Sequence, residues 1–247
     1  TYGLVADWST PTRLYATGDW QGRGKIYRSE DRGAKWEEIY TEPNTGTVIT
    51  MLAQNPEHPE TLYAGTSAGV VFRTTDGGQT WGSLQSVNAP AISPVFDANG
   101  TVLYLVASGK GIFRSRDGGA TFEAIPGSSK SAVTKTLPEV TSLVTDPSRS
   151  GTMYAGTKNG LFRSHDFGDS WEEIPVIESS KKFPVRSIAV NPRNSNELVY
   201  SAALAVYKTT DGGATWSIYQ LNANRAVGTL RYDPQDTNIL YLGLRTF

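Results

Sequence analysis

The residues best suited to chemistry stand close together near the N-terminus. Asp19, Trp20 and Arg23 supply an acid, an aromatic platform and a cation within one short stretch. An inverting glycosidase would need a second carboxylate about 6.5–9.5 Å from the first. No motif marks one, because Glu139 and Glu178 lie in or beside long polar segments and match no pattern. Two interpretations stay open, a ligand-binding turn and a decorated, exposed hairpin without a ligand.

Composition excludes several other kinds of site. The chain has 247 residues and no Cys, so disulfides, thiolate metal sites and Cys nucleophiles are excluded. The two histidines, His58 and His165, are far apart in sequence, which argues against a His-based metal site. A net charge of −1 gives no global field for nucleic acid. No apolar run approaches the ~20 residues of a membrane helix. We expect no cofactor, no metal, no nucleic acid and no membrane span.

A repeated segment organises the whole chain. Each of five copies has a basic residue, then Ser or Thr, Asp, Gly and an aromatic residue at fixed spacing. Each copy follows a Tyr near the start of an apolar run, and a sixth Tyr, Tyr241, has no such copy after it. Self-similarity at a fixed period is typical of repeat architectures. The aspartates of the five copies are 41 to 49 residues apart: Asp31, Asp76, Asp117, Asp166 and Asp211.

Each repeat predicts four short strands joined by tight turns. In the fourth copy the strands fall within 141–145, 152–157, 161–164 and 170–174. A four-stranded unit that recurs every ~40–45 residues is typical of a β-propeller blade. No segment keeps an apolar period of 3.6 residues, so helix should be minor. We predict an all-β propeller of four-stranded antiparallel blades, with five complete blades over 1–42, 46–86, 91–126, 139–176 and 184–220 and a partial sixth over 229–246.

The repeated segment resembles the Asp-box, also called the bacterial neuraminidase repeat. The resemblance covers essentially the whole chain and implies a β-propeller, in a group that includes sialidases, xyloglucanase-type endoglucanases and sortilin-type receptors. The box residues have a structural interpretation. Each Asp can accept hydrogen bonds from its own turn, each Gly can take a positive φ, and the aromatic residues should be buried: Trp36, Trp81, Phe122, Trp171 and Trp216.

The resemblance also bears on catalysis. Xyloglucanase-type enzymes carry a catalytic Asp after a Tyr-Ala-x-Thr-Asp stretch, which is similar to Tyr15-Ala-Thr-Gly-Asp19 here. Asp19 is therefore the candidate acid of a glycoside hydrolase. Sialidases carry an Arg-Ile-Pro stretch that this chain lacks. The arginines that could form a sialidase triad on the ligand face are Arg13, Arg23, Arg186 and Arg225.

Turns in such a propeller alternate between two faces. The Asp-box hairpins lie on one face, and the resemblance implies that function lies on the other. That opposite face should hold the turns near 18–25, 67–69, 108–110, 158–160 and 202–205, and the long links 126–138 and 175–186. The candidate ligand-binding residues there are Trp20, Arg23, Lys158, Arg186 and Arg225. The basic stretches 128–135 and 179–182 are either solvated loops or an anion or polysaccharide contact.

These observations favour a non-catalytic binding or assembly propeller whose ligand is a carbohydrate or a protein. The alternative is a xyloglucanase-like glycoside hydrolase, or a fragment of one, with Asp19 as its acid. We expect an extracellular or periplasmic location and a single propeller domain over residues 1–247. Either the ring closes with a two-stranded sixth blade, or a further segment or an oligomer completes a larger ring. Because the chain begins at an innermost strand, we favour the larger ring.

Overall fold

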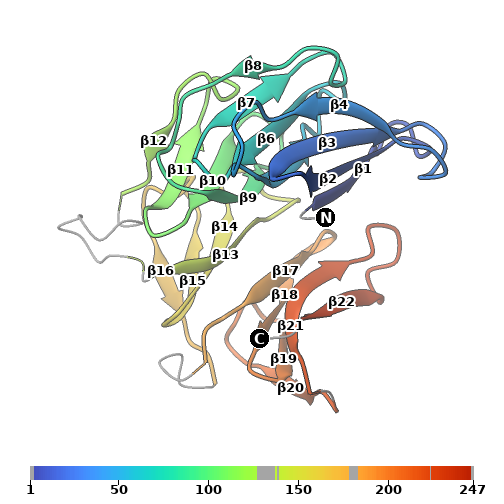
Figure 1. The fold of residues 1–247 in the computed structure, drawn as a ribbon. Coiled ribbons are helices and arrows are strands. Elements are labelled where there is room, and N and C mark those ends of the chain that lie inside the picture. Colours follow the sequence, from blue (N-terminus) through green and yellow to red (C-terminus); the bar gives the residue numbers. More distant parts are fainter. Residues whose placement is uncertain (1–2, 127–136, 138, 178–182, 223, 246–247) are drawn as a thin grey trace. The chain divides into compact units, whose positions relative to one another are not determined.

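The computed structural model describes residues 3–126, 137, 139–177, 183–222 and 224–245. Over these residues the chain contains strands and turns and no helix. It forms two compact units, residues 1–123 and 124–247 (Figure 1). The strands form five four-stranded antiparallel sheets and one two-stranded sheet. The prediction of an all-β propeller with five complete blades and a partial sixth is confirmed.

The first unit holds three blades, each built in chain order. Blade 1 consists of β1 (Gly3–Ala6), β2 (Leu14–Trp20), β3 (Arg23–Ser29) and β4 (Glu37–Thr41). Blade 2 consists of β5 (Ile49–Gln54), β6 (Leu62–Thr66), β7 (Val71–Thr74) and β8 (Gly82–Ser83). Blade 3 consists of β9 (Ala91–Phe96), β10 (Leu103–Ala107), β11 (Gly111–Ser115) and β12 (Glu123–Ala124), whose last residue falls in the second unit. The first strands of neighbouring blades contact each other.

The second unit holds two blades and the two-stranded sheet. Blade 4 consists of β13 (Val140–Thr145), β14 (Met153–Thr157), β15 (Gly160–Ser164) and β16 (Glu172–Ile174). Blade 5 consists of β17 (Ser187–Asn191), β18 (Asn194–Ala202), β19 (Ala205–Thr209) and β20 (Ser217–Gln220). The last sheet pairs β21 (Ala226–Tyr232) with β22 (Leu240–Arg245).

The apolar core lies between neighbouring blades. Tyr15 and Ile26 of blade 1 pack with Leu52, Leu62 and Phe72 of blade 2. The same arrangement recurs between blades 2 and 3 and between blades 4 and 5. The repeated Tyr of each complete blade is at most 2% exposed, whereas Tyr241 of β22 is 57% exposed. Within each unit, neighbouring complete blades therefore stabilise each other through the side chains of one sheet face.

The Asp-box forms the hairpin between the third and fourth strand of each complete blade. In blade 2, Thr74 Oγ1 donates to Asp76 Oδ1 over 2.6 Å, and the same carboxylate accepts the Thr80 N–H over 2.9 Å. The Gly77 N–H donates to Glu60 O, which ties this hairpin to the turn between the first and second strands of the same blade. Both turns of a blade thus lie on one face, as the predicted alternation of turns requires.

Of the five box aromatics, Phe122 is buried, Trp81, Trp171 and Trp216 are half-buried, and Trp36 is 42% exposed, so the expected burial is wrong for Trp36. The other box aromatics show why. The Trp81 ring lies 5.8 Å from that of Tyr40 in the preceding blade, and Trp216 Nε1 donates to Pro175 O beyond the end of the preceding blade. The box aromatic thus packs against the blade before its own. Blade 1 is the first of its unit, so Trp36 has no preceding blade in that unit.

Candidate functional site

The hairpin between β2 and β3 is the longest of its kind in the first unit. Its strands stay paired up to Trp20 and Arg23, which lie opposite each other. Gln21 and Gly22 form the turn, and both have positive φ, 52° and 72°. Positive φ at both central residues is the geometry of a two-residue type I′ turn. The segment before β5 packs along the tip of this hairpin, since the Gly46 N–H donates to Gly22 O over 2.6 Å and the Gly24 N–H donates to Thr47 O over 2.8 Å.

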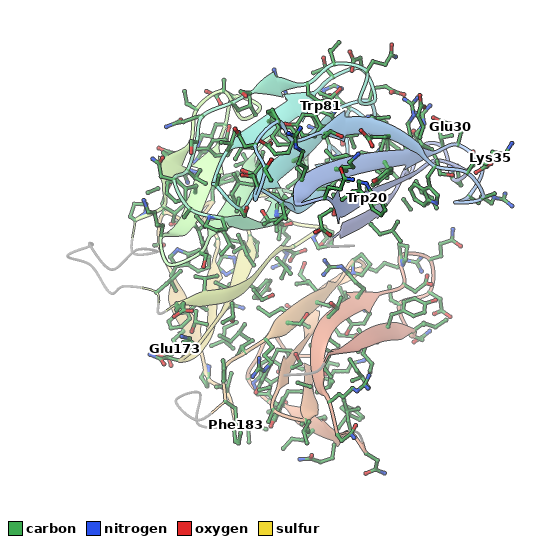
Figure 2. All side chains as sticks on the ribbon, viewed as in Figure 1. Trp20, Glu30, Lys35, Trp81, Glu173 and Phe183 are labelled. Atoms are coloured by element: carbon green, nitrogen blue, oxygen red, sulfur yellow. The ribbon has the colours of Figure 1, made fainter. Side chains whose placement is uncertain are left out.

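The three residues of this hairpin do not share one side. Side chains alternate along a strand, so Trp20 and Arg23 lie on one sheet face and Asp19, opposite Gly24, lies on the other. Trp20 is 63% exposed, and its position on the hairpin is labelled in Figure 2. Lys25 follows on the same face and forms an ion pair with Glu38. This face presents an exposed aromatic ring beside an exposed guanidinium.

Asp19 is exposed and has no hydrogen bond or ion pair to any residue that the structure describes. In the same row of the sheet, beyond Gly24, lies a second acid that the sequence did not reveal. The Glu42 N–H donates to Gly24 O over 2.8 Å, which places Glu42 on the opposite flank of Gly24 from Asp19. No sequence motif surrounds Glu42, and only the strand register reveals its position.

Glu42 is buried, with 6% exposure, and its carboxylate is already bonded. It accepts hydrogen bonds from Tyr40 Oη over 3.1 Å and from Asn44 Nδ2 over 2.9 Å. Burial, followed by the charge of Glu42, raises the pKa of Tyr40 well above its usual range. A Cβ on Gly24 would lie 2.6 Å from Ile49 N, so the backbone before β5 covers the space between the two acids. Asp19 and Glu42 do not flank an open groove.

The other candidate residues belong to the second unit. Lys158 lies in the hairpin between β14 and β15, and its Nζ is 2.6 Å from Glu139 Oε2. Arg186 is half-buried just before β17, and Arg225 is exposed just before β21. The Val185 N–H donates to Thr157 O over 3.1 Å, which brings the segments of Lys158 and Arg186 together. Glu178 and the basic stretches 128–135 and 179–182 lie outside the described residues.

Arg13 was expected on the ligand face, and the structure places it on the opposite, Asp-box face. It lies in the turn between β1 and β2, where its side chain pairs with Asp7, Glu30 and Glu60. Its guanidinium links Asp7 and Glu30 of blade 1 to Glu60 of blade 2. Over the residues that the structure describes, no group of three or more His, Asp or Glu side chains could hold a metal ion. No helix in that part of the chain could cross a membrane.

The chain resembles one protein family and one group of enzymes in sequence. The family described as Sortilin-Vps10 (sortilin, neurotensin receptor 3) matches residues 24–105 and 110–241. The xyloglucanase Xgh74A of Acetivibrio thermocellus is 27% identical over 268 residues, which cover 86% of this chain and 31% of that protein. The chain thus spans about a third of the length of this curated relative.

Solved structures show the same fold. An ancestral GH74 enzyme superposes with a TM-score of 0.78 at 22% identity, over 96% of this chain and 33% of its own. The GH74 xyloglucanase from Xanthomonas campestris gives 0.74 at 18% identity, over 97% of this chain and 43% of its own. YCF48 bound to D1 peptide gives 0.67 at 17% identity, over 92% of this chain and 73% of its own. At these identities the likeness concerns the fold alone.

Proposed function

The chain belongs to the sortilin-Vps10 family, and from this premise we propose that it is a carbohydrate-binding β-propeller module. Its ligand surface is the face opposite the Asp-box hairpins, and xyloglucan is the first ligand to test. The observation that carries the proposal is the exposed pair of Trp20 and Arg23 on one side of the long β2–β3 hairpin. An exposed aromatic ring can stack on a sugar, and a guanidinium can donate to its hydroxyl groups.

The relative identified as a xyloglucanase supports this class of ligand. Lys158, Arg186 and Arg225 are proposed as ligand contacts of the second unit by itself, on its turns and links opposite its own Asp-box hairpins. A polysaccharide ligand would meet the protein outside the cytoplasm, so an extracellular or periplasmic location goes with this proposal. We also propose that residues 1–247 act as one propeller domain, or as part of a larger one.

Affinity electrophoresis in gels with and without xyloglucan tests the binding surface. We expect xyloglucan to retard the chain, and Trp20→Ala to weaken binding about tenfold, because the stacking platform is lost. The matched control is Trp8→Ala, which removes a 57% exposed Trp from the turn between β1 and β2, on the Asp-box face. An absence of retardation, or an equal loss in both variants, contradicts the proposal.

A second candidate function is hydrolysis of the same polysaccharide, with Asp19 as the acid. The observation in its favour is the exposed position of Asp19, near the tip of the hairpin. In this case new reducing ends should accumulate when the chain is incubated with xyloglucan, and Asp19→Asn should abolish them while retardation in the gel persists. Activity that survives Asp19→Asn, or the absence of new reducing ends, rules out this candidate and leaves the binding proposal intact.

A further inference from the structure

A pocket of about 630 Å³ lies on the Asp-box face of the first unit, between blades 2 and 3. Its walls come from the turns between the first and second strands of both blades and from the two Asp-box hairpins. The guanidinium of Arg73, on β7, lies in this pocket. The size is in the range of small-ligand sites. Because it lies on the face opposite the proposed xyloglucan surface, this site is independent of that proposal.

Arg73 belongs to a set of basic residues at one position of the third strand. In blades 1, 3 and 4 the arginine pairs with a Glu directly across on the fourth strand. The Arg28 Nη2 to Glu37 distance is 3.1 Å, and the Arg114 Nη2 to Glu123 and Arg163 Nη2 to Glu172 distances are 2.7 and 2.6 Å. The Nε atoms of Arg114 and Arg163 also donate to those glutamates. Lys208 of blade 5 pairs with Glu197 instead.

Arg73 differs from this set in one respect. The residue across from it on the fourth strand is Gly82. Arg73 Nη1 still donates to Gly118 O in the next Asp-box over 2.7 Å, as Arg28 Nη1 donates to Gly77 O. The guanidinium is therefore oriented as in the other blades. Its Nε and Nη2 have no carboxylate partner among the described residues.

A second pocket, lined by the third and fourth strands of blade 4 and by the Asp-box hairpin of blade 5, holds another arginine of this set. That pocket has a volume of about 380 Å³ and contains Arg163 together with Glu172 and Glu173. An internal carboxylate already satisfies its arginine. The pocket between blades 2 and 3 contains the equivalent arginine, Arg73, whose partner across on the fourth strand is Gly82, a residue that has no carboxylate and does not line the pocket. A guanidinium fork with a free edge matches the geometry of a carboxylate.

We propose that this pocket binds the carboxylate of an acidic sugar, a uronic acid. Besides Arg73, the side chains that line it are mainly hydroxyl and amide groups, from Thr61, Thr75, Thr101 and Asn99. Such groups donate to and accept from sugar hydroxyls. The one acidic side chain in the wall, Glu57, disfavours a phosphate dianion, which carries more negative charge than a carboxylate. The chemistry thus selects a monoanionic, hydroxyl-rich ligand.

Titration of the chain with D-glucuronate and D-galacturonate, followed by NMR or calorimetry, tests the proposal. We expect saturable binding of at least one uronate and none of the neutral sugars glucose and galactose. Arg73→Gln should weaken uronate binding about tenfold or more, because it removes a charge-assisted, bidentate contact. The matched control is Arg28→Gln, which removes an arginine that already has internal carboxylate partners and should leave uronate affinity unchanged.

A reciprocal pair of variants avoids deleting Arg73. A Cβ on Gly82 would meet only Arg73 O, at 4.0 Å, so a side chain fits there. Gly82→Glu restores the carboxylate of the other blades and should compete uronate away, whereas Gly82→Gln, of the same size and without charge, should retain binding. No uronate binding, equal binding of glucose, tighter binding of inorganic phosphate, or equal loss in Arg28→Gln and Arg73→Gln overturns the proposal.

Discussion

At the scale of single residues, the Asp-box carboxylates are occupied in holding their own turns. The pKa of Asp117 is lowered to about 2, mainly by hydrogen bonds from the Thr121 side chain and N–H and from Ser115. The same kinds of contact hold the pKa values of Asp76 and Asp211 far below the usual range. A carboxylate that stays ionised and bonded in this way is a poor general acid at neutral pH. This favours a structural role for the boxes.

The lowered pKa makes a prediction about acid stability. A carboxylate whose pKa is lower in the folded chain contributes stability that is present above its ordinary value of 3.8 and is lost as pH falls through about 2. Asp117→Asn should therefore lower Tm by a few degrees at pH 7 and by less at pH 2, as measured by circular dichroism. Asp19→Asn is the control, because Asp19 has no described partner. A Tm loss that is equal at both pH values contradicts this account.

The side chains of Asp19 and Trp20 lie on opposite faces of the sheet, and the sequence alone did not show this. Their adjacency suggested a joint site, yet adjacent residues on a strand point to opposite sides. The distinction needed the strand to extend as far as Trp20, and the Gln21-Gly22 turn decides that extent. Gly82 was likewise visible in the sequence. Its meaning depended on knowing which fourth-strand residue lies across from each arginine.

At the scale of elements, the Asp-box hairpins demand a left-handed residue after the Asp. Gly occupies this position in blades 2, 3 and 5, with φ of 67° to 74°, whereas blades 1 and 4 have Arg32 and Phe167 at 60° and 61°. Residues other than Gly are strained in this region. The hairpin geometry therefore persists where the sequence departs from the consensus, and blades 1 and 4 carry a local cost.

Arg32→Gly should relieve that cost in blade 1. We expect the free energy of unfolding to rise by about 0.5–1 kcal/mol, the strain of a positive φ less the added freedom of Gly in the unfolded chain. Urea denaturation measures the change. Arg32 is exposed, so little packing is lost with its side chain. Arg32→Ala, which removes the side chain and keeps the strain, should give no gain. If the two variants are equally stable, the strain is not the cause.

The elements themselves were largely predictable, because turn residues and alternating apolar positions mark each strand. All four strands of each of the five blades occur within the expected ranges. The start of the last sheet was placed at 229, and β21 begins at Ala226. A register shift between Val227 and Thr229 lengthens this strand. The pattern could not show the shift, since it breaks the alternation on which the prediction depends.

At the scale of the whole molecule, the second unit presents apolar side chains to solvent. Ile218 and Tyr219 on β20 are 45% and 54% exposed, and Leu242 and Leu244 on β22 are 42% and 43% exposed. Exposed apolar side chains near a sheet edge favour association. We predict that the molar mass measured by light scattering rises with protein concentration. The variant Tyr219→Ser/Leu242→Ser should reduce this rise.

The matched control for this double variant is Trp8→Ser, which removes an exposed apolar side chain from the other unit. It should leave the concentration dependence unchanged. A molar mass of 26.8 kDa at every concentration would show that these side chains do not drive association. The sequence allowed for an oligomer that completes the ring. It could not indicate which side chains are exposed, since the last sheet repeats the apolar pattern of the buried ones.

The arginine that reaches from a third strand to the carbonyl of the next Asp-box has a consequence for how such chains change in evolution. The contact joins blade 1 to blade 2, blade 2 to blade 3, and blade 4 to blade 5 with the same pair of groups. A duplicated blade would arrive with both halves of this joint and would need no new interface. The number of blades can therefore change by gene duplication. A single copy can also lose the glutamate that pairs with its arginine, as blade 2 has done, and the arginine then becomes available to a ligand such as the proposed uronate.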